Sequence, residues 1–239
     1  MLLPGSRGKN KISILKLFCT IMNQSNLNPG ELTASVVGLG LMGCSITACL
    51  VMAGHKVVAV APIPGDMVTA EPRISEHLKR SFKEGITSKK PEDMLSNLTI
   101  TEDYTSLRQC NLVIECTLED PEIKKNIYAK IEACVPDDAL ITSNTSAIPI
   151  SILQQHTRVP SRFFGLHWAE PSHTTRFLEI ICGDKSDVKH AEWLYELSHL
   201  WGKEPTLVRK DIRGFITNRL MYAMYREAFS LVENGSATV

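Results

Sequence analysis

The sequence predicts an α/β fold: a doubly wound, mostly parallel sheet with helices on both faces, followed by a final long helix. Three observations support this prediction. Short apolar runs alternate with longer amphipathic segments, as in parallel strands joined by crossover helices. A glycine-rich turn at residues 38–43 separates the first apolar run from the first helical segment. The chain of 239 residues is long enough to bury a large core.

The first βαβ unit is the clearest local signal. Residues 35–37 predict a strand, and the small, apolar segment up to Ala53 predicts a helix that Gly54 ends. Residues 56–60 predict the second strand. This order places the glycine turn after a strand and at the start of a helix.

The later segments continue the alternation and then change direction. Further helices are predicted at residues 73–83, 121–134, 187–201 and 214–232. Further strands are predicted at residues 111–116, 139–142, 163–167, 177–181 and 206–209. Because only a polar loop joins the strands at 163–167 and 177–181, they predict an antiparallel addition at the far side of the sheet.

Composition narrows the class of protein. Lys and Arg total 26 and balance 26 Asp and Glu, which argues against a nucleic-acid groove or a polybasic membrane surface. Hydrophobic residues make up 44% and charged residues 22% of the chain, as in globular proteins. Seven cysteines without a CxxC pair predict reduced core residues in a cytoplasmic protein, with neither a disulfide framework nor a metal site.

Residues 1–33 predict a flexible extension ahead of the domain at 34–212. The apolar stretch at 12–22 is too short for a membrane helix, and no small-residue cleavage site follows it. We therefore expect neither a membrane span nor secretion, and Met22 is an alternative start.

The final helical segment carries an apolar stripe that no later segment covers. The stripe consists of Ile216, Leu220, Met224, Ala228 and Leu231. Two explanations stay open: a second subunit covers the stripe in a homodimer, or residues 213–239 are the start of a second domain that the chain does not complete.

The glycine turn has the pattern G-x-G-x-x-G, formed by Gly38, Gly40 and Gly43. In dinucleotide-binding sites the first glycine makes the tight turn, the second admits the pyrophosphate, and the third lets the helix pack on the strand. Backbone N–H groups of Leu41 and Met42 then face the phosphates at the helix N-terminus. The alternative is a vacant, structural turn.

The acidic residue that usually holds the cofactor ribose is missing from its expected place. The second strand ends at Ala61, and Asp66 is the first acidic residue after it. No Arg or Lys replaces it, so the sequence shows no pocket for the extra phosphate of NADP.

Four further segments follow the glycine turn in a recognisable order. They are VIECTLED at 113–120, SNTS at 143–146, GLHWAEP at 165–171 with FLE at 177–179, and GFITNR at 214–219. Together they resemble the L-3-hydroxyacyl-CoA dehydrogenase family from residue 34 to the end of the chain. The resemblance implies a Rossmann-type NAD-binding domain followed by the first helix of an all-α C-terminal domain. It also implies an NAD cofactor, a small-molecule substrate and a homodimer.

The resemblance also implies a catalytic pair. His167 matches the family's general base, which takes the proton of the substrate's 3-hydroxyl, and Glu179 matches the carboxylate that orients it. The chemistry needs a pair because an imidazole alone is neither fixed in one tautomer nor supported once protonated. The alternative is a histidine at a strand end that bonds only to the backbone.

The remaining site residues follow from the same motifs. Ser146 and Asn218 match residues that hydrogen-bond the substrate or its developing oxyanion, although a helix cap and a solvated helix face are the simpler interpretations. Glu119 and Lys124 match positions at the nicotinamide end of the cofactor, with a charge pair at a helix start as the alternative. Residues 78–80 lie where the family offers basic groups to CoA, but a solvated face is the better interpretation.

Two departures bear on the substrate. Glu170 stands where the family has an Asn that contacts the nicotinamide ribose, and the loop at 172–176 is more polar than usual. A polar loop beside the catalytic histidine suits a small polar substrate as well as an acyl chain. Because the family's helical domain closes the cleft, we expect low activity from a chain that ends at Val239.

These observations predict an NAD-dependent oxidoreductase that interconverts an L-3-hydroxyacyl-CoA and a 3-ketoacyl-CoA, with a role in fatty acid metabolism. One alternative is a dehydrogenase of a small polar hydroxy acid, of the sugar-acid type. The other is a non-catalytic dinucleotide-binding relative, which Ala61 and Glu170 would favour.

Overall fold

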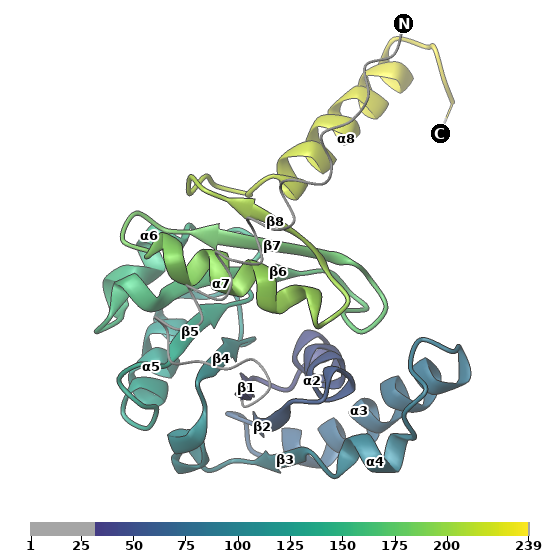
Figure 1. Cartoon of the computed structure of the whole chain (residues 1–239). Coiled ribbons are helices and arrows are strands. Elements are labelled where there is room, and N and C mark those ends of the chain that lie inside the picture. Colours follow the sequence, from purple (N-terminus) through teal and green to yellow (C-terminus); the bar gives the residue numbers. More distant parts are fainter. Residues whose placement is uncertain (1–31, 239) are drawn as a thin grey trace, which may run out of the picture.

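The computed structural model describes residues 32–238, so the predicted N-terminal extension lies almost wholly outside the described residues (Figure 1). These residues form one eight-stranded sheet in the order β3-β2-β1-β4-β5-β6-β7-β8. The strands are β1 Thr33–Val37, β2 Lys56–Val60, β3 Leu98–Thr101, β4 Leu112–Glu115, β5 Leu140–Ser143, β6 Phe163–Trp168, β7 Phe177–Cys182 and β8 Glu204–Val208. The helices are α2 Leu41–Ala53, α3 Asp66–Lys83, α4 Pro91–Leu95, α5 Pro121–Glu132, α6 Ile150–Leu153, α7 Val188–His199 and α8 Thr217–Glu233. Short 3-10 turns are η2 Tyr104–Gln109, η3 Gln154–His156 and η4 Pro160–Arg162.

The sheet confirms the predicted doubly wound, mostly parallel architecture. Strands β3, β2, β1, β4, β5 and β6 run parallel, and β7 pairs antiparallel with β6 as the short connection predicts. Strand β8 is parallel to β7. The strand order reverses between β1 and β4, and this switch point is where α/β sheets bind ligands.

Two hydrophobic clusters cover the two faces of the sheet. One includes Leu50 of α2, Leu78 of α3 and Trp193 of α7. The other includes Tyr128 of α5 and Ile150 of α6. The core therefore has helices on both sides, and the six cysteines of the described residues are free.

The elements around α3 differ from the prediction. Helix α3 starts at Asp66 rather than residue 73 and continues through Pro72. A proline normally marks the first turn of a helix, so the sequence pattern placed the start too late. The short helix α4 and the half-exposed edge strand β3 were not predicted, because each spans too few residues for its periodicity to stand out.

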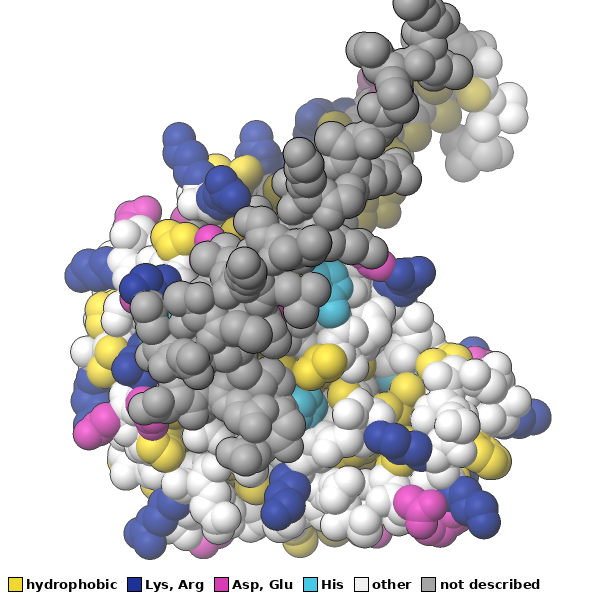
Figure 2. All heavy atoms as spheres, in the orientation of Figure 1, with side chains coloured by type: hydrophobic (Ala, Val, Ile, Leu, Met, Phe, Trp, Pro, Cys, Tyr) yellow, Lys and Arg dark blue, Asp and Glu magenta, His cyan; other side chains and the backbone are white. Residues whose placement is uncertain are grey.

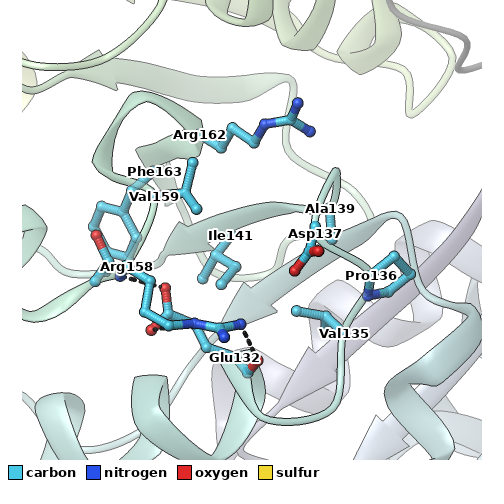
Figure 3. Close-up of a pocket in the computed structure, with 11 residues that line it drawn as sticks. Glu132, Val135, Pro136, Asp137, Ala139, Ile141, Arg158, Val159, Arg162 and Phe163 are labelled. Atoms are coloured by element: carbon cyan, nitrogen blue, oxygen red, sulfur yellow. Dashed lines mark hydrogen bonds and ion pairs between the residues drawn. The ribbon is translucent and has the colours of Figure 1, made fainter.

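Residues from the end of α5 and from the loop before β6 pack together at the amino ends of β5 and β6 (Figure 3). Arg158 donates its backbone N–H to Glu132 Oε1 at 2.7 Å, and its guanidinium lies 3.8 Å from Glu132 Oε2. The cavity left beside Phe163 has a volume of about 20 Å³, which holds little more than one water. This cavity is therefore too small for a ligand larger than water.

Helix α8 extends away from the body of the molecule (Figure 1). It begins at Thr217, three residues later than predicted, because Gly214 and Phe215 have positive φ angles of 79° and 50°. None of its residues is buried among the described residues, so the predicted apolar stripe is exposed. Across residues 32–238, no helix combines the length and apolar character needed to cross a membrane.

Candidate active site

The glycine turn has the geometry that an anionic ligand requires. A Cβ on Gly43 would lie 1.8 Å from the Gly38 carbonyl oxygen, so this position holds α2 against the turn. A Cβ on Gly40 would meet nothing within 4 Å, which leaves open space at the helix N-terminus. The first intrahelical bond runs from Cys44 N to Gly40 O, and no acidic side chain lies in the first turn. The backbone N–H groups of the first turn of α2, which precede Cys44, are therefore available to bind a phosphate.

A cavity of about 460 Å³ opens beside this turn. Gly38, Gly40, Leu41 and Met42 line one side, with Pro62, Ile63, Ile123 and Ile127 among the apolar residues of the other. Gly43 does not line the cavity but packs behind it. The open glycine cradle and the apolar walls fit the pyrophosphate and the adenine of NAD, respectively.

Ala61 is buried at the end of β2 and offers no side chain to a ribose. Asp66, in the first turn of α3, does line the same cavity and is the acidic residue among its described lining residues. The structure therefore supplies a carboxylate from the start of α3 rather than from the end of β2.

A buried carboxylate, Glu115, lies at the carboxyl end of β4. Its Oε1 accepts hydrogen bonds from Thr117 at 2.6 Å and from Lys124 Nζ at 2.8 Å. Its Oε2 accepts from Ser143 Oγ at 2.7 Å and from Tyr128 OH at 3.0 Å. Both oxygens are therefore occupied by this chain's own groups, and we call these five residues the Glu115 cluster.

Lys124, predicted to contact the cofactor, is 1% exposed within this cluster. Its ammonium also lies 3.6 Å from Glu119 Oε2. A cofactor contact by Lys124 stays a prediction, but its hydrogen bonds hold the helix start of α5 to β4.

Glu119 has a second role in this structure. Its Oε1 accepts from Thr145 Oγ1 at 2.6 Å, from Ser146 N at 2.8 Å and from Ala147 N at 3.1 Å. The carboxylate thereby ties the loop after β4 to the loop after β5 and fixes the backbone at Ser146.

The structure brings His167 and Glu179 together. They are paired directly across the β6–β7 ladder, and His167 Nδ1 lies 2.8 Å from Glu179 Oε2. No hydrogen bond to His167 Nε2 occurs within residues 32–238, and Nε2 is not among the fully buried, unpartnered atoms of that range. The ring is therefore held at one nitrogen and accessible at the other.

The turn before α8 holds the other oxygen of Glu179. Glu179 Oε1 accepts from Ile216 N at 3.0 Å and Thr217 N at 2.9 Å. Phe215, a bulky residue with φ of 50°, packs its ring 5.6 Å from the His167 ring. Left-handed backbone of this kind is costly and is concentrated at functional sites.

The environment of Glu179 favours its ionised form. Burial raises the pKa of the carboxyl, but hydrogen bonds from His167 and from the backbone of Thr217 and Ile216 outweigh burial, so the pKa lies below its ordinary value. A carboxylate accepts rather than donates, so His167 Nδ1 is the donor to Glu179 Oε2, and in the neutral imidazole the lone pair lies on Nε2.

Ser146 and Asn218 also meet. Asn218 Nδ2 donates to the Ser146 backbone oxygen at 2.7 Å, so the start of α8 is anchored to the loop after β5. The Ser146 side chain is exposed. The predicted contacts of Ser146 and Asn218 with the substrate stay predictions.

Two polar residues of the loop after β6 are packed into the core. Ser172 and His173 are buried against α2, where Ser172 N donates to Ser45 Oγ at 2.7 Å and Ser45 Oγ lies 3.2 Å from His173 Nδ1. Burial lowers the pKa of His173 to about 4, so the ring is neutral at pH 7. The polarity of Ser172 and His173 therefore serves packing, whereas Thr174 and Thr175 are half-buried and Arg176 is exposed.

Glu170 is exposed at the start of that loop. Burial by its surroundings raises the pKa of its carboxyl, while hydrogen bonding to Ser45 and Ser172 opposes the shift. Its predicted contact with the cofactor stays a prediction.

Both basic residues of the segment 78–80 face solvent. Leu78 is buried, Lys79 is exposed, and Arg80 pairs with Glu84 at 2.8 Å on the surface. This arrangement agrees with a solvated helix face. Among the described residues, no group of three or more metal-ligating side chains occurs.

Sequence reasoning overlooked Glu115 and Asn144 as organising residues. Asn144 Oδ1 accepts from Trp168 N at 3.0 Å and so links the loop after β5 to the end of β6. The signal for Glu115 was available, because a carboxylate inside an apolar strand needs buried partners.

Comparison with known proteins agrees with this geometry. The model of the NAD-binding domain of 3-hydroxyacyl-CoA dehydrogenase matches residues 33–212. A relative from Mesorhizobium japonicum, 5-formyl-3-hydroxy-2-methylpyridine 4-carboxylate 5-dehydrogenase, is 33% identical over 202 residues, covering 84% of this chain. The chain spans 65% of that relative's length.

Two solved structures are similar in fold and sequence. FadB2 of M. tuberculosis is 33% identical with a TM-score of 0.80, covering 86% of this chain and 73% of that chain. The 3-hydroxybutyryl-CoA dehydrogenase of Escherichia coli K12 is 30% identical with a TM-score of 0.82, covering 88% of this chain and 44% of that chain. The chain therefore belongs to the 3-hydroxyacyl-CoA dehydrogenase family and carries its NAD-binding domain.

Proposed function

We propose that this protein is an NAD-dependent oxidoreductase that interconverts an L-3-hydroxyacyl-CoA and the corresponding 3-ketoacyl-CoA. The observation that supports it best is the His167–Glu179 pair, which holds an imidazole at Nδ1 and leaves Nε2 accessible. A histidine that bonded only to the backbone would not need a buried carboxylate held by two further N–H groups.

In the oxidative direction, His167 Nε2 accepts the proton of the substrate's 3-hydroxyl. Glu179 fixes the tautomer and stabilises the imidazolium that results. Ser146 and Asn218 offer a hydroxyl and an amide to the oxygen on C3, which carries partial negative charge as the proton leaves. NAD, when bound, supplies the hydride acceptor.

We propose contacts with the cofactor from the glycine turn, from the start of α3, and from the segments that follow β4 and β6. Gly38, Gly40, Leu41 and Met42 form the pyrophosphate cradle, and Gly43 lets α2 pack closely behind it. Asp66 binds the ribose hydroxyls, because Ala61 at the usual position has no polar side chain. A carboxylate at this site would favour NAD over NADP, since it repels the 2′-phosphate of NADP. Glu119, Lys124 and Glu170 are proposed at the nicotinamide end.

A small hydroxy acid is the second candidate substrate. The Mesorhizobium relative is named for a small aromatic carboxylate rather than for an acyl-CoA. Both candidates use the same dyad and the same hydride acceptor, and they differ in the group carried beside the reacting carbon.

We further propose a homodimer in the cytoplasm with a role in fatty acid metabolism. The exposed apolar residues of α8, such as Leu220 and Met224, support the dimer. The mass in solution, measured by light scattering, tests it: twice the mass of 26.6 kDa is expected, and a monomer would contradict it.

The proposed activity is tested by a substrate panel. Oxidation of NADH is followed at its absorbance maximum with acetoacetyl-CoA, acetoacetate and small aromatic keto acids, and each rate is repeated with NADPH. NADH-dependent reduction of acetoacetyl-CoA is expected. Binding of NADH without turnover of any ketone would favour the non-catalytic alternative and contradict the proposal.

A further inference from the structure

A basic cavity lies on the α8 side of the candidate active site. Its volume is about 660 Å³, and it is lined by Ser146 and Asn218 together with Arg213, Arg219 and Arg226. We call these three arginines the arginine pocket. Figure 2 shows Lys and Arg side chains gathered over the loop that joins β8 to α8, near the base of that helix.

The helix geometry places the arginines on one side. Arg219, Tyr222 and Arg226 are spaced at i, i+3 and i+7, so their side chains project from the same face of α8. Arg213 reaches the cavity from the loop before the helix. Asn218, bonded to the Ser146 backbone, fixes this face of α8 against the loop after β5.

The arginine pocket has no internal counter-charge. No acidic residue lines the cavity, and none of the three guanidinium groups has an ion pair or hydrogen bond within residues 32–238. Elsewhere in that range exposed arginines do find carboxylates, as Arg80 does with Glu84 and Arg176 with Glu204. All three side chains are exposed, and an anion that bridged them would relieve the repulsion between these permanently charged groups.

We propose that the arginine pocket binds an anionic oxygen group of the substrate, a carboxylate or a phosphate, while the reacting carbon lies at His167. The inference rests on the proposed function, since it places the anion on the same molecule that the dyad oxidises. A guanidinium group can donate two parallel N–H hydrogen bonds either to a carboxylate or to a phosphate, so both anions are recognised by the same chemistry. The pocket would thereby select substrates by charge, whereas the dyad selects the hydroxyl.

The test measures binding without the cofactor, so that loss of NAD binding or of turnover does not affect it. Three probes are titrated by ligand-observed NMR: acetoacetate, coenzyme A and the neutral methyl acetoacetate. The proteins compared are the wild type, the double variant Arg213→Gln/Arg226→Gln and the conservative double variant Arg213→Lys/Arg226→Lys. The control is Arg108→Gln, which removes an exposed arginine that does not line the cavity. Thermal unfolding of each variant confirms that the fold is retained.

The wild type should bind at least one of the two anions, and the Gln double variant should bind it about tenfold or more weakly. The Lys variant should fall between them, Arg108→Gln should equal wild type, and methyl acetoacetate should not distinguish any of the proteins. Loss of acetoacetate binding identifies a carboxylate, and loss of coenzyme A binding identifies a phosphate. If wild type binds neither anion, or if Arg108→Gln weakens binding as much as the double variant, the inference is wrong. A wild type that binds the anion yet turns over no ketone would refute the proposed function alone.

Discussion

Two buried carboxylates at the same edge of the sheet are used in opposite ways. Glu115 has both oxygens occupied by hydrogen bonds from Lys124, Tyr128, Ser143 and Thr117. Glu179 has one oxygen on two backbone N–H groups and the other on an imidazole whose second nitrogen is accessible. Glu115, whose hydrogen bonds all come from buried or half-buried groups, stabilises the fold. Glu179 instead orients an imidazole that can still accept a proton at its second nitrogen, as catalysis requires.

The largest expected effect is on stability, at Glu115. In Glu115→Gln the buried ammonium of Lys124 loses its nearest anion, so the free energy of unfolding should fall by about 3–5 kcal/mol. Chemical denaturation measures it, with Glu122→Gln as control because that carboxylate belongs to an exposed pair with Lys125. The double variant Glu115→Gln/Lys124→Gln should recover part of the loss, and no recovery would contradict the structural role of the pair.

The same substitution at Glu179 should act on turnover. Glu179→Gln leaves the imidazole without a carboxylate to support its charged form, and kcat/KM should fall by about 10²-fold, or about 2.7 kcal/mol. NADH affinity should stay within about twofold, since Glu179 does not line the glycine cavity. Steady-state kinetics with the best ketone of the panel measures this loss. If Glu115→Gln, per folded molecule, lost as much turnover as Glu179→Gln, the contrast between the two carboxylates would disappear.

A smaller effect distinguishes two glycines of the turn. Gly40→Ala places a methyl group in open space where the pyrophosphate is expected, so NADH affinity should fall about tenfold while stability changes by less than about 1 kcal/mol. Gly43→Ala places it against the Gly38 carbonyl and should lower stability instead. Fluorescence titration and thermal unfolding of both variants check the pair. Equal NADH affinity in Gly40→Ala and wild type would argue for a vacant turn.

The smallest effect is a pH dependence of stability. The pKa of Glu179 is lower in the folded protein than its ordinary value of 4.5, so its ionisation stabilises the fold above that value and the contribution is lost as the pH falls below it. The difference in melting temperature between wild type and Glu179→Gln should therefore shrink on acidification. A difference that stays constant or grows as the pH drops would show that the ion-pairing account of Glu179 is wrong.

Much of the fold could be predicted from the sequence, because the hydrophobic pattern of these elements and the residues that end them lie close together in the chain. The glycine turn, the strand at 56–60 and the hairpin that pairs His167 with Glu179 are local or near-local features. The start of α3 at Asp66 was missed because Pro72 lies inside the helix, where tertiary packing overrides the usual preference.

The site was harder to predict where partners are distant in sequence. Lys124 reads as a surface charge on its helix, yet its partner Glu115 lies on another element and buries it. The inward packing of Ser172 and His173 depends on Ser45, 127 and 128 residues away, which no local pattern reveals. The arginine pocket likewise depends on where the turn at Phe215 directs α8.

The most direct test of the central claim is the turnover of His167→Ala beside its affinity for NADH. If His167 is the base that Glu179 orients, the rate with the best ketone should fall by about 10²–10⁴-fold while the dissociation constant for NADH stays within about twofold of wild type. A variant that retains the wild-type rate would show that the dyad is not the catalytic centre.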